Sequence, residues 1–418
     1  MISLLMTTLD TGNTSWLTIS TILVMLMTVP GLALFYGGLV RSKNILSVIM
    51  QCLMCTAVMS LLWIAFGYSW VFGTGFHGTG IGAFIGGFDK VFLHGVTIHS
   101  IMSPSGVPEI TFCLFQCMFA VITPGLIIGA FAERLKFSSF MVFIIFWSIL
   151  VYYPMAHFVW GGGWLQQMGA LDFAGGTVVH INAGVSALIM AVLLGRRSDY
   201  RPDRPIAATN VTYVFLGAVF LWLGWFGFNA GSGLVADGLD ANAFLVTHLC
   251  TCVAALTWMA IDWIYSGKPT TVGVCTGAVA GLVAITPAAG STDVLGAIVI
   301  GIITSLVCYF MVAYVKPKLG YDDALDAFGV HGVGGIIGSI LTGVFATAVV
   351  TGGAKGALYG DWHQLGVQLI ATGFAIVYSG VITFILFKVI DKTMGIRVEP
   401  RVEEEGLDIY EHGESAYN

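Results

Sequence analysis

The sequence has little charge, and what it lacks excludes several classes of protein. Only 10% of its 418 residues are charged and 57% are hydrophobic. A soluble chain of this length could not bury so much apolar surface. No acidic residue lies in the middle of a long apolar run, which argues against a proton pump built on a carboxylate relay. No Asn-Pro-Ala pair occurs, which disfavours an aquaporin-like channel.

The sequence also lacks a recognisable metal-binding motif, a signal-peptide pattern and an overall excess of basic residues. All eight cysteines fall inside apolar runs, and the pair at Cys52 and Cys55 has neither a second pair nor a polar cradle, so no metal or cofactor is predicted. No basic region precedes the first apolar run, so no cleaved signal peptide is expected. Residues 391–418 carry eight acids and three bases, a charge of −5 out of −6 for the chain, and nothing suggests nucleic-acid binding.

Long apolar runs are what the sequence does have. The mean hydropathy is +0.89, and stretches of about 20 residues, long enough to cross a lipid bilayer, recur along the chain. We therefore predict an all-α polytopic membrane protein with eleven transmembrane helices. The expected spans are 16–39, 45–72, 110–132, 138–158, 175–195, 208–231, 243–265, 271–289, 294–315, 327–350 and 364–389.

The basic residues predict the orientation of these spans. With the N-terminus outside and the C-terminus inside, fifteen of the seventeen Lys and Arg residues, Arg204 among them, fall on the inner side, and only Lys90 and Lys355 fall outside. We therefore expect a transmembrane domain over residues 1–390 and a cytoplasmic tail over 391–418.

The spans form two related halves, about 16–195 and 208–350, with 364–389 as an extra helix. Ala-Val-Ile-Thr-Pro at 120–124 is echoed by Val-Ala-Ile-Thr-Pro at 283–287, in spans three and eight. Because each half has an odd number of spans, the halves must be inverted relative to each other. Transport sites form at the interface of such inverted repeats.

Spans five and ten each carry one histidine in a matching context. Asp172 precedes His180 by eight residues, Asp323 precedes His331 by eight, and a glycine follows each histidine four residues later. An ionisable side chain at membrane depth is costly, so it marks a functional site by default. We expect the two histidines to line a pore. Counting from the span ends places them on opposite sides of the midplane, so they meet only if their helices begin inside the protein, which Asp172 and Asp326 would allow as buried residues.

Several stretches together resemble one family. They are Pro30-Gly-Leu-Ala-Leu-Phe-Tyr-Gly-Gly38, Gly125-Leu-Ile-Ile-Gly-Ala-Phe-Ala-Glu-Arg134, His157-Phe-Val-Trp-Gly-Gly-Gly163, 172–182, Gly224-Trp-Phe-Gly-Phe-Asn-Ala-Gly-Ser232, Phe328-Gly-Val-His-Gly-Val333 and the tail from Glu405 to Tyr417. They closely resemble the ammonium transporter family (Amt/Mep, with the Rh proteins as distant relatives) over essentially the whole chain. The resemblance implies a homotrimer in the cell membrane with one pore per subunit, and a tail that receives a PII-type regulatory protein.

The resemblance also assigns an outer cation site to Phe119, Trp160 and Ser232. A hydroxyl can accept one N–H of an ammonium ion, and aromatic faces attract its charge. The resemblance pairs Phe228 with Phe119 as stacked rings that close the pore. Ordinary packing, or a place in the interfacial aromatic belt, is the alternative role for each aromatic side chain. Asp172 is expected to be a structural cap for backbone N–H groups that also favours a cation from a distance.

Below the rings, the resemblance makes His180 and His331 a twin-histidine lining. A neutral imidazole has one donor and one acceptor nitrogen, so two in contact can share a proton and bind ammonia. We therefore predict an electrogenic ammonium transporter, not an enzyme, that captures NH4+, deprotonates it and conducts NH3. The alternatives are an electroneutral NH3 gas channel, a haem-binding redox protein, and an ammonium sensor, although related sensors carry an appended signalling domain that this chain lacks.

Overall fold

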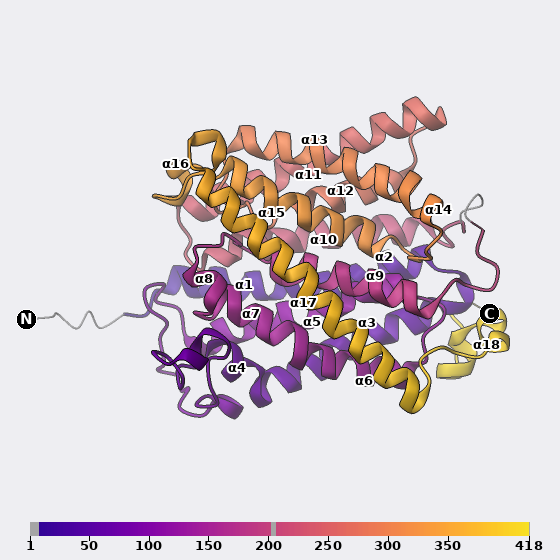
Figure 1. The fold of residues 1–418 in the computed structure, drawn as a ribbon, viewed down its shortest axis with the longest axis horizontal. Coiled ribbons are helices and arrows are strands. Elements are labelled where there is room, and N and C mark those ends of the chain that lie inside the picture. The colour runs from indigo at the N-terminus through magenta and orange to yellow at the C-terminus, as the bar shows by residue number, and fades with distance from the viewer. Residues whose placement is uncertain (1–7, 202–205, 418) are drawn as a thin grey trace, which may run out of the picture.

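The computed structural model describes residues 8–201 and 206–417, so Arg204 lies outside the described residues. In these residues the fold is all-helical, and most helices run between two opposite faces of the molecule (Figure 1). We call the face where α1 begins the N-terminal face and the face that carries residues 395–417 the C-terminal face. The chain therefore starts and ends on opposite faces.

All eleven predicted spans correspond to helical segments in the described residues. Ten of them are long enough to cross a membrane, and the remaining one, α12, is a shorter apolar helix. In order they are Thr11–Leu39 (α1 and α2), Ser42–Phe72 (α3 and α4), Glu109–Phe131 (α5), Phe137–Gln167 (α6 to α8), Gly176–Leu194 (η7 and α9), Val211–Gly233 (α10 and η8), Gly238–Ser266 (α11), Thr271–Ile285 (α12), Val294–Leu319 (α13, η9 and α14), Phe328–Phe345 (η10 and α15) and Trp362–Met394 (α17).

Short polar side chains set the starts of many of these helices. The first N–H groups of a helix lack partners within it, and Asp, Asn and Thr side chains supply oxygens for them. Helices that begin this way include α1, α10, α11, α12, α13 and α17, at Asp10, Asn210, Asp237, Thr270, Asp293 and Asp361. These caps fix where each apolar segment enters the bundle.

The helices that directly follow the two histidine turns, η7 (Gly176–Ile181) and η10 (Phe328–Gly332), run in opposite directions and cross at close range. α9 (Asn182–Leu194) runs toward the C-terminal face and α15 (Val333–Phe345) runs away from it (Figure 1). At Gly184 an added Cβ would lie 2.1 Å from the backbone nitrogen of Gly332, and at Gly335 it would lie 3.0 Å from the Cβ of His180. The two glycines therefore permit a reciprocal, antiparallel crossing, as inverted halves require.

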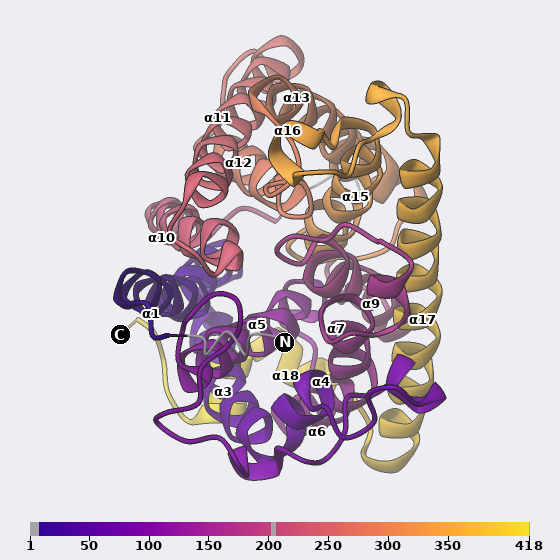
Figure 2. The ribbon, with the colours of Figure 1, turned by 90° about the vertical axis from the view of Figure 1, so that its left-hand side faces the viewer.

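The last long helix, α17, joins the two halves from outside (Figure 2). Its Gln368 side chain hydrogen-bonds both the N–H and the carbonyl of Leu171 in the first half, at 2.7 and 2.8 Å. The same side chain donates to the Ser339 carbonyl in the second half at 3.2 Å. One buried amide thus holds the loop before η7 against α15.

The acidic tail is folded onto the C-terminal face. The Asp408 carboxylate accepts from the backbone N–H groups of Leu46 and Ser47 at 3.0 and 2.8 Å, which caps the start of α3. Glu403 accepts from the Ser198 N–H at 2.7 Å and pairs with Arg397 at 2.7 Å. These contacts tie the tail to two loops of the membrane domain.

Candidate functional site

The three residues expected to form an outer cation site line one cavity. Phe119, Trp160 and Ser232 line a cavity of about 280 Å³ toward the N-terminal face. The Trp160 indole N–H donates to the Asp172 carbonyl at 2.9 Å, and the Ser232 hydroxyl donates to the Phe228 carbonyl at 2.7 Å. Because that hydroxyl has given its hydrogen to a carbonyl, its oxygen is left to accept from a donor in the cavity.

One residue that lines this outer cavity, Phe119, is stacked on a second phenyl ring, that of Phe228. The ring centroids of Phe119 and Phe228 are 4.3 Å apart with 28° between their planes. Trp160 meets Phe119 edge to face at 5.8 Å. Both phenylalanines are almost fully buried, at 1% and 0% exposure. An ion passing between these rings would first have to lose its water.

Beneath the rings the two histidines lie in contact, although they belong to different halves. The His180 and His331 ring centroids are 5.4 Å apart and nearly parallel, at 15°. His180 is also stacked on Trp225, at 5.4 Å and 18°, and lies 6.0 Å from Phe228. The stacked phenylalanines and the histidine pair thus form one continuous row of rings.

The histidine rings have nitrogen atoms without hydrogen-bond partners. Both ring nitrogens of His180 and Nδ1 of His331 are buried and have no partner among residues 8–201 and 206–417. Buried polar atoms are almost always hydrogen-bonded, so each exception needs an explanation. These three atoms are therefore donors or acceptors that remain available to a small polar solute.

Two buried carboxylates explain how the histidines meet. Asp172 accepts from the N–H groups of four consecutive residues, 175–178, at 2.6 to 3.1 Å. Asp323 accepts from the N–H groups of 327–329 at 2.8 to 3.4 Å. Each carboxylate starts a helix below the protein surface, which brings its histidine to the crossing point. The cap of the second helix is therefore Asp323 and not Asp326, which pairs with Lys316.

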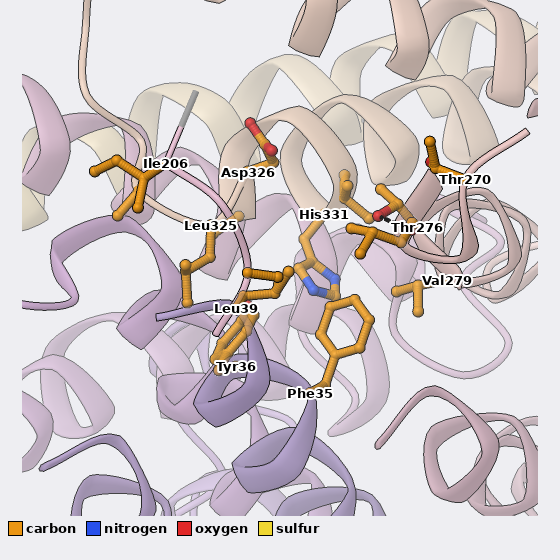
Figure 3. Close-up of a pocket in the computed structure, with 15 residues that line it drawn as sticks. Phe35, Tyr36, Leu39, Ile206, Thr270, Thr276, Val279, Leu325, Asp326 and His331 are labelled. Atoms are coloured by element: carbon orange, nitrogen blue, oxygen red, sulfur yellow. Dashed lines mark hydrogen bonds between the residues drawn. The ribbon is translucent and has the colours of Figure 1, made fainter. Parts of the chain in front are cut away.

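A second cavity opens below His331 on the side of the C-terminal face. It measures about 340 Å³ and is lined by the Phe35, Tyr36, Thr276, Asp326 and His331 side chains, among others. Figure 3 shows the His331 ring pointing into it beside Phe35. The stacked phenylalanines and the histidine pair therefore lie between two cavities, one toward each face.

A largely buried ion-pair cluster joins the loops of the C-terminal face. Glu133 accepts from Arg41 at 2.6 Å and from Arg197 at 3.1 Å, and Asp322 binds Arg197 at 2.8 Å and Arg134 at 3.3 Å. Burial alone would raise the pKa of Glu133, but Arg41 and Arg197 outweigh it and lower that pKa to about 2. The pKa of Asp322 is lowered in the same way, against its burial, by Arg134 and Arg197.

Two residues of the site were missed by sequence reasoning. Trp225 stacks on His180 and donates its indole N–H to Thr286 Oγ1 at 2.9 Å. It lies in the Gly224–Ser232 motif, three residues before Phe228, and that helical spacing was the available signal. Asp323 was noted only as part of the repeat, and its equivalence to Asp172 was the signal for its role as a cap.

The fold and the site define a class: a polytopic membrane protein in which stacked phenylalanine rings and a histidine pair lie between two cavities. The sequence model of the Ammonium Transporter Family matches residues 15–417. An ammonium transporter of Aquifex aeolicus is 51% identical over 98% of this chain and 94% of its own length. The chain therefore belongs to the ammonium transporter family, and it is a multi-pass cell-membrane transport protein for ammonium rather than an enzyme.

Solved structures agree with this assignment. The crystal structure of Saccharomyces cerevisiae Mep2 superposes with a TM-score of 0.87 at 37% identity, covering 94% of this chain and 88% of Mep2. A structure titled Sensor Amt Protein superposes with a TM-score of 0.87 at 30% identity, covering 96% of this chain and 98% of that one.

Proposed function

We propose that this ammonium transporter captures NH4+ in the outer cavity, removes a proton there, and conducts NH3 past the histidine pair with net transfer of charge. Phe119 and Trp160 offer aromatic faces to the cation and Ser232 offers a hydroxyl oxygen. An ammonium ion has lost most of its hydration once it reaches this cavity, and these groups replace part of it. The proton then follows the histidine row to the inner side.

The gate geometry supports a step in which the ion loses its proton. The 4.3 Å stack of Phe119 and Phe228 leaves no room for a hydrated ion. Carrying a bare charge through an apolar constriction is far costlier than carrying neutral ammonia. Separate passage of NH3 and a proton avoids that cost.

The observation that carries this proposal is the row of unpartnered ring nitrogens on His180 and His331. Each neutral imidazole can donate through one nitrogen and accept through the other. Two rings 5.4 Å apart can therefore guide ammonia by hydrogen bonding and relay a proton between them. Asp172 supports this arrangement as the cap that sets the position of His180.

We also infer the orientation and assembly. The basic loops support a cytoplasmic C-terminal face, with residues 1–390 as the transmembrane domain and 391–418 as a regulatory tail. The family resemblance supports a homotrimer and a PII-type regulatory protein that binds at this face. Asp408 contacts the start of α3 and Glu403 contacts the loop at Ser198. Through these contacts a conformational change of the tail would be transmitted to the membrane domain.

The test is an ammonium-evoked current from proteoliposomes on a solid-supported membrane, with His180→Gln compared against the parent. Glutamine keeps polarity but cannot relay a proton, so we expect the current to fall at least about tenfold, a barrier increase of about 1.4 kcal/mol. The matched control is His363→Gln, because His363 is exposed at the start of α17. If the parent carries no current but takes up ammonia, the path is an electroneutral gas channel.

An ammonium sensor is the second candidate, and the likeness to the structure titled Sensor Amt Protein favours it. A sensor would change conformation on binding ammonium without sustained flux. The same proteoliposomes separate the two, because a sensor would give neither steady current nor uptake.

A further inference from the structure

An apolar groove lies on the outer surface of the bundle near the C-terminal face, away from the pore. Its volume is about 690 Å³, within the range of about 300–1,000 Å³ typical of ligand pockets. α9 contributes Val192, the end of α14 contributes Leu319, and α17 contributes Phe384. These three side chains are 55%, 69% and 45% exposed, so the described protein leaves the groove open.

An arginine with unused donors lies at the end of this groove. The Arg196 side chain donates through Nε to the Gly320 carbonyl, and its guanidinium lies 5.7 Å from the ring centroid of Tyr200. It forms no ion pair with a carboxylate of residues 8–201 or 206–417. Its neighbour Arg197, by contrast, is occupied by Glu133 and Asp322. Arg196 is thus held in place, and its terminal N–H groups donate to no acceptor in residues 8–201 or 206–417.

A second cation lies close to one wall of the groove. The Lys388 ammonium lies 5.8 Å from the ring of Phe384, a wall of the groove. Asp322 also lines the groove, but Arg197 and Arg134 neutralise it. The groove therefore combines apolar walls with a basic rim at one end.

A second surface groove provides a contrast. It measures about 380 Å³ between α10, α11 and α12, and its walls include Val219, Trp222 and Ala255. No Lys or Arg of the described chain lines it. Any apolar membrane surface contacts acyl chains, but of these two grooves the α9/α14/α17 groove is the one with a cation in its lining, Arg196.

We propose that the α9/α14/α17 groove binds a phospholipid with an anionic head group. An acyl chain lies along the apolar walls, and the phosphate accepts from Arg196 with Lys388 nearby. Basic pockets between transmembrane helices at the inner surface suit anionic head groups in this way, and an Arg–phosphate pair can form two parallel hydrogen bonds. The floor includes Phe328, three residues before His331, so occupancy would also stabilise the segment η10 (Phe328–Gly332).

The first experiment measures lipid retention by native mass spectrometry. The purified, delipidated full-length protein is mixed with phosphatidylglycerol or phosphatidylcholine. We expect the parent to retain phosphatidylglycerol about tenfold better, the order expected for a charge-assisted hydrogen bond. Arg196→Gln should bring retention to the phosphatidylcholine level, and Arg196→Lys should preserve most of it. Undiminished preference in Arg196→Gln would overturn the proposal.

A second pair of variants tests the groove without changing charge. Val192→Trp fills the α9/α14/α17 groove and should lower phosphatidylglycerol retention, whereas Val219→Trp fills the second groove and should leave it unchanged. Equal effects would overturn the proposal, as would a change in oligomeric state caused by Val192→Trp alone, which would make the groove a subunit contact. Millimolar glycerol 3-phosphate should not displace the lipid, and displacement would instead indicate a site for soluble anions. This readout is independent of ammonium flux.

Discussion

The two histidine segments share one local design but differ in their surroundings. In 172–184 and in 323–335, a buried carboxylate caps a π-helical turn, the histidine follows at the eighth residue, and a glycine four residues later lies at the crossing. The first segment lies under the indole of Trp160, which donates to the Asp172 carbonyl. The second borders Lys316 and Asp326 and opens to the inner cavity.

This difference shows how an inverted repeat acquires direction. The caps and glycines are arranged in the same way in both halves, because each histidine must lie at the point where the two helices cross. The surroundings differ because one segment faces an aromatic cavity and the other a cavity with charged groups. Variants made in pairs, one in each segment, therefore separate the shared design from the specialised surroundings.

The largest contrast is expected at the crossing glycines. A Cβ at Gly184 would lie 2.1 Å from a backbone nitrogen, and a Cβ at Gly335 would lie 3.0 Å from its nearest neighbours. Backbone cannot move aside as a side chain can. Gly184→Ala should therefore cost about 3 kcal/mol or more, whereas Gly335→Ala should cost about 1–3 kcal/mol.

Thermal unfolding in detergent, read by size-exclusion chromatography after heating, ranks these two variants. Gly366→Ala is the control, since an added Cβ there meets nothing within 4 Å. A melting temperature for Gly335→Ala below that of Gly184→Ala would mean that the crossing is not arranged as described.

The next contrast concerns the caps. Asp172→Asn replaces one of two oxygens that together accept four N–H groups, and the amide N–H₂ would then face donors. We expect a loss of about 2–3 kcal/mol, in the range for hydrogen bonds to charged groups. Asp323→Asn should cost about 1–2 kcal/mol, because Asp323 accepts only three N–H groups, one of them at 3.4 Å.

Melting temperatures of the two cap variants, measured side by side, check this ordering. Asp326→Asn serves as the control because its side chain caps no N–H in the described helices and pairs with Lys316 instead. If Asp326→Asn were less stable than Asp323→Asn, the helix would be capped by Asp326 and not by Asp323.

The sequence was sufficient to predict what depends on composition and periodicity. Hydropathy gave eleven spans whose ends mostly lie within a few residues of the helices, because apolar length is set by the membrane. It could not show that the histidines meet, because counting residues assumes that helices begin at the membrane surface, and Asp172 and Asp323 start theirs inside the protein.

The direction in which a side chain points was the other feature that the sequence did not predict. Trp225 lies among other aromatic residues of α10, and apart from its spacing from Phe228 the local pattern does not distinguish the ring that faces His180 from its neighbour Phe226, which instead stacks on Phe244 at 4.0 Å. The helix is apolar all round, so periodicity gives no preferred face. Only tertiary packing decides which ring lines the path.

The smallest contrast follows from Trp225, which stacks on the His180 ring, whereas among the described residues His331 stacks on His180 and has no indole stacked on it. Trp225→Phe keeps an aromatic face but removes the indole hydrogen bond to Thr286, and Thr286→Val removes it from the other side. Each change should cost about 0.5–1.5 kcal/mol. Because both remove the same bond, the double variant should be little worse than either single one.

This double-mutant cycle can be measured both as the free energy of unfolding and as the ammonium-evoked current. If the bond orients Trp225, both single variants should lower the ammonium-evoked current by the same modest factor, about twofold to tenfold for a barrier change of 0.5–1.4 kcal/mol. Additive effects on the current would mean that Trp225 and Thr286 act separately. In that case His180 would be held by its crossing with α15, as His331 is held by its crossing with α9, and the two segments would be more alike than their ring contacts indicate.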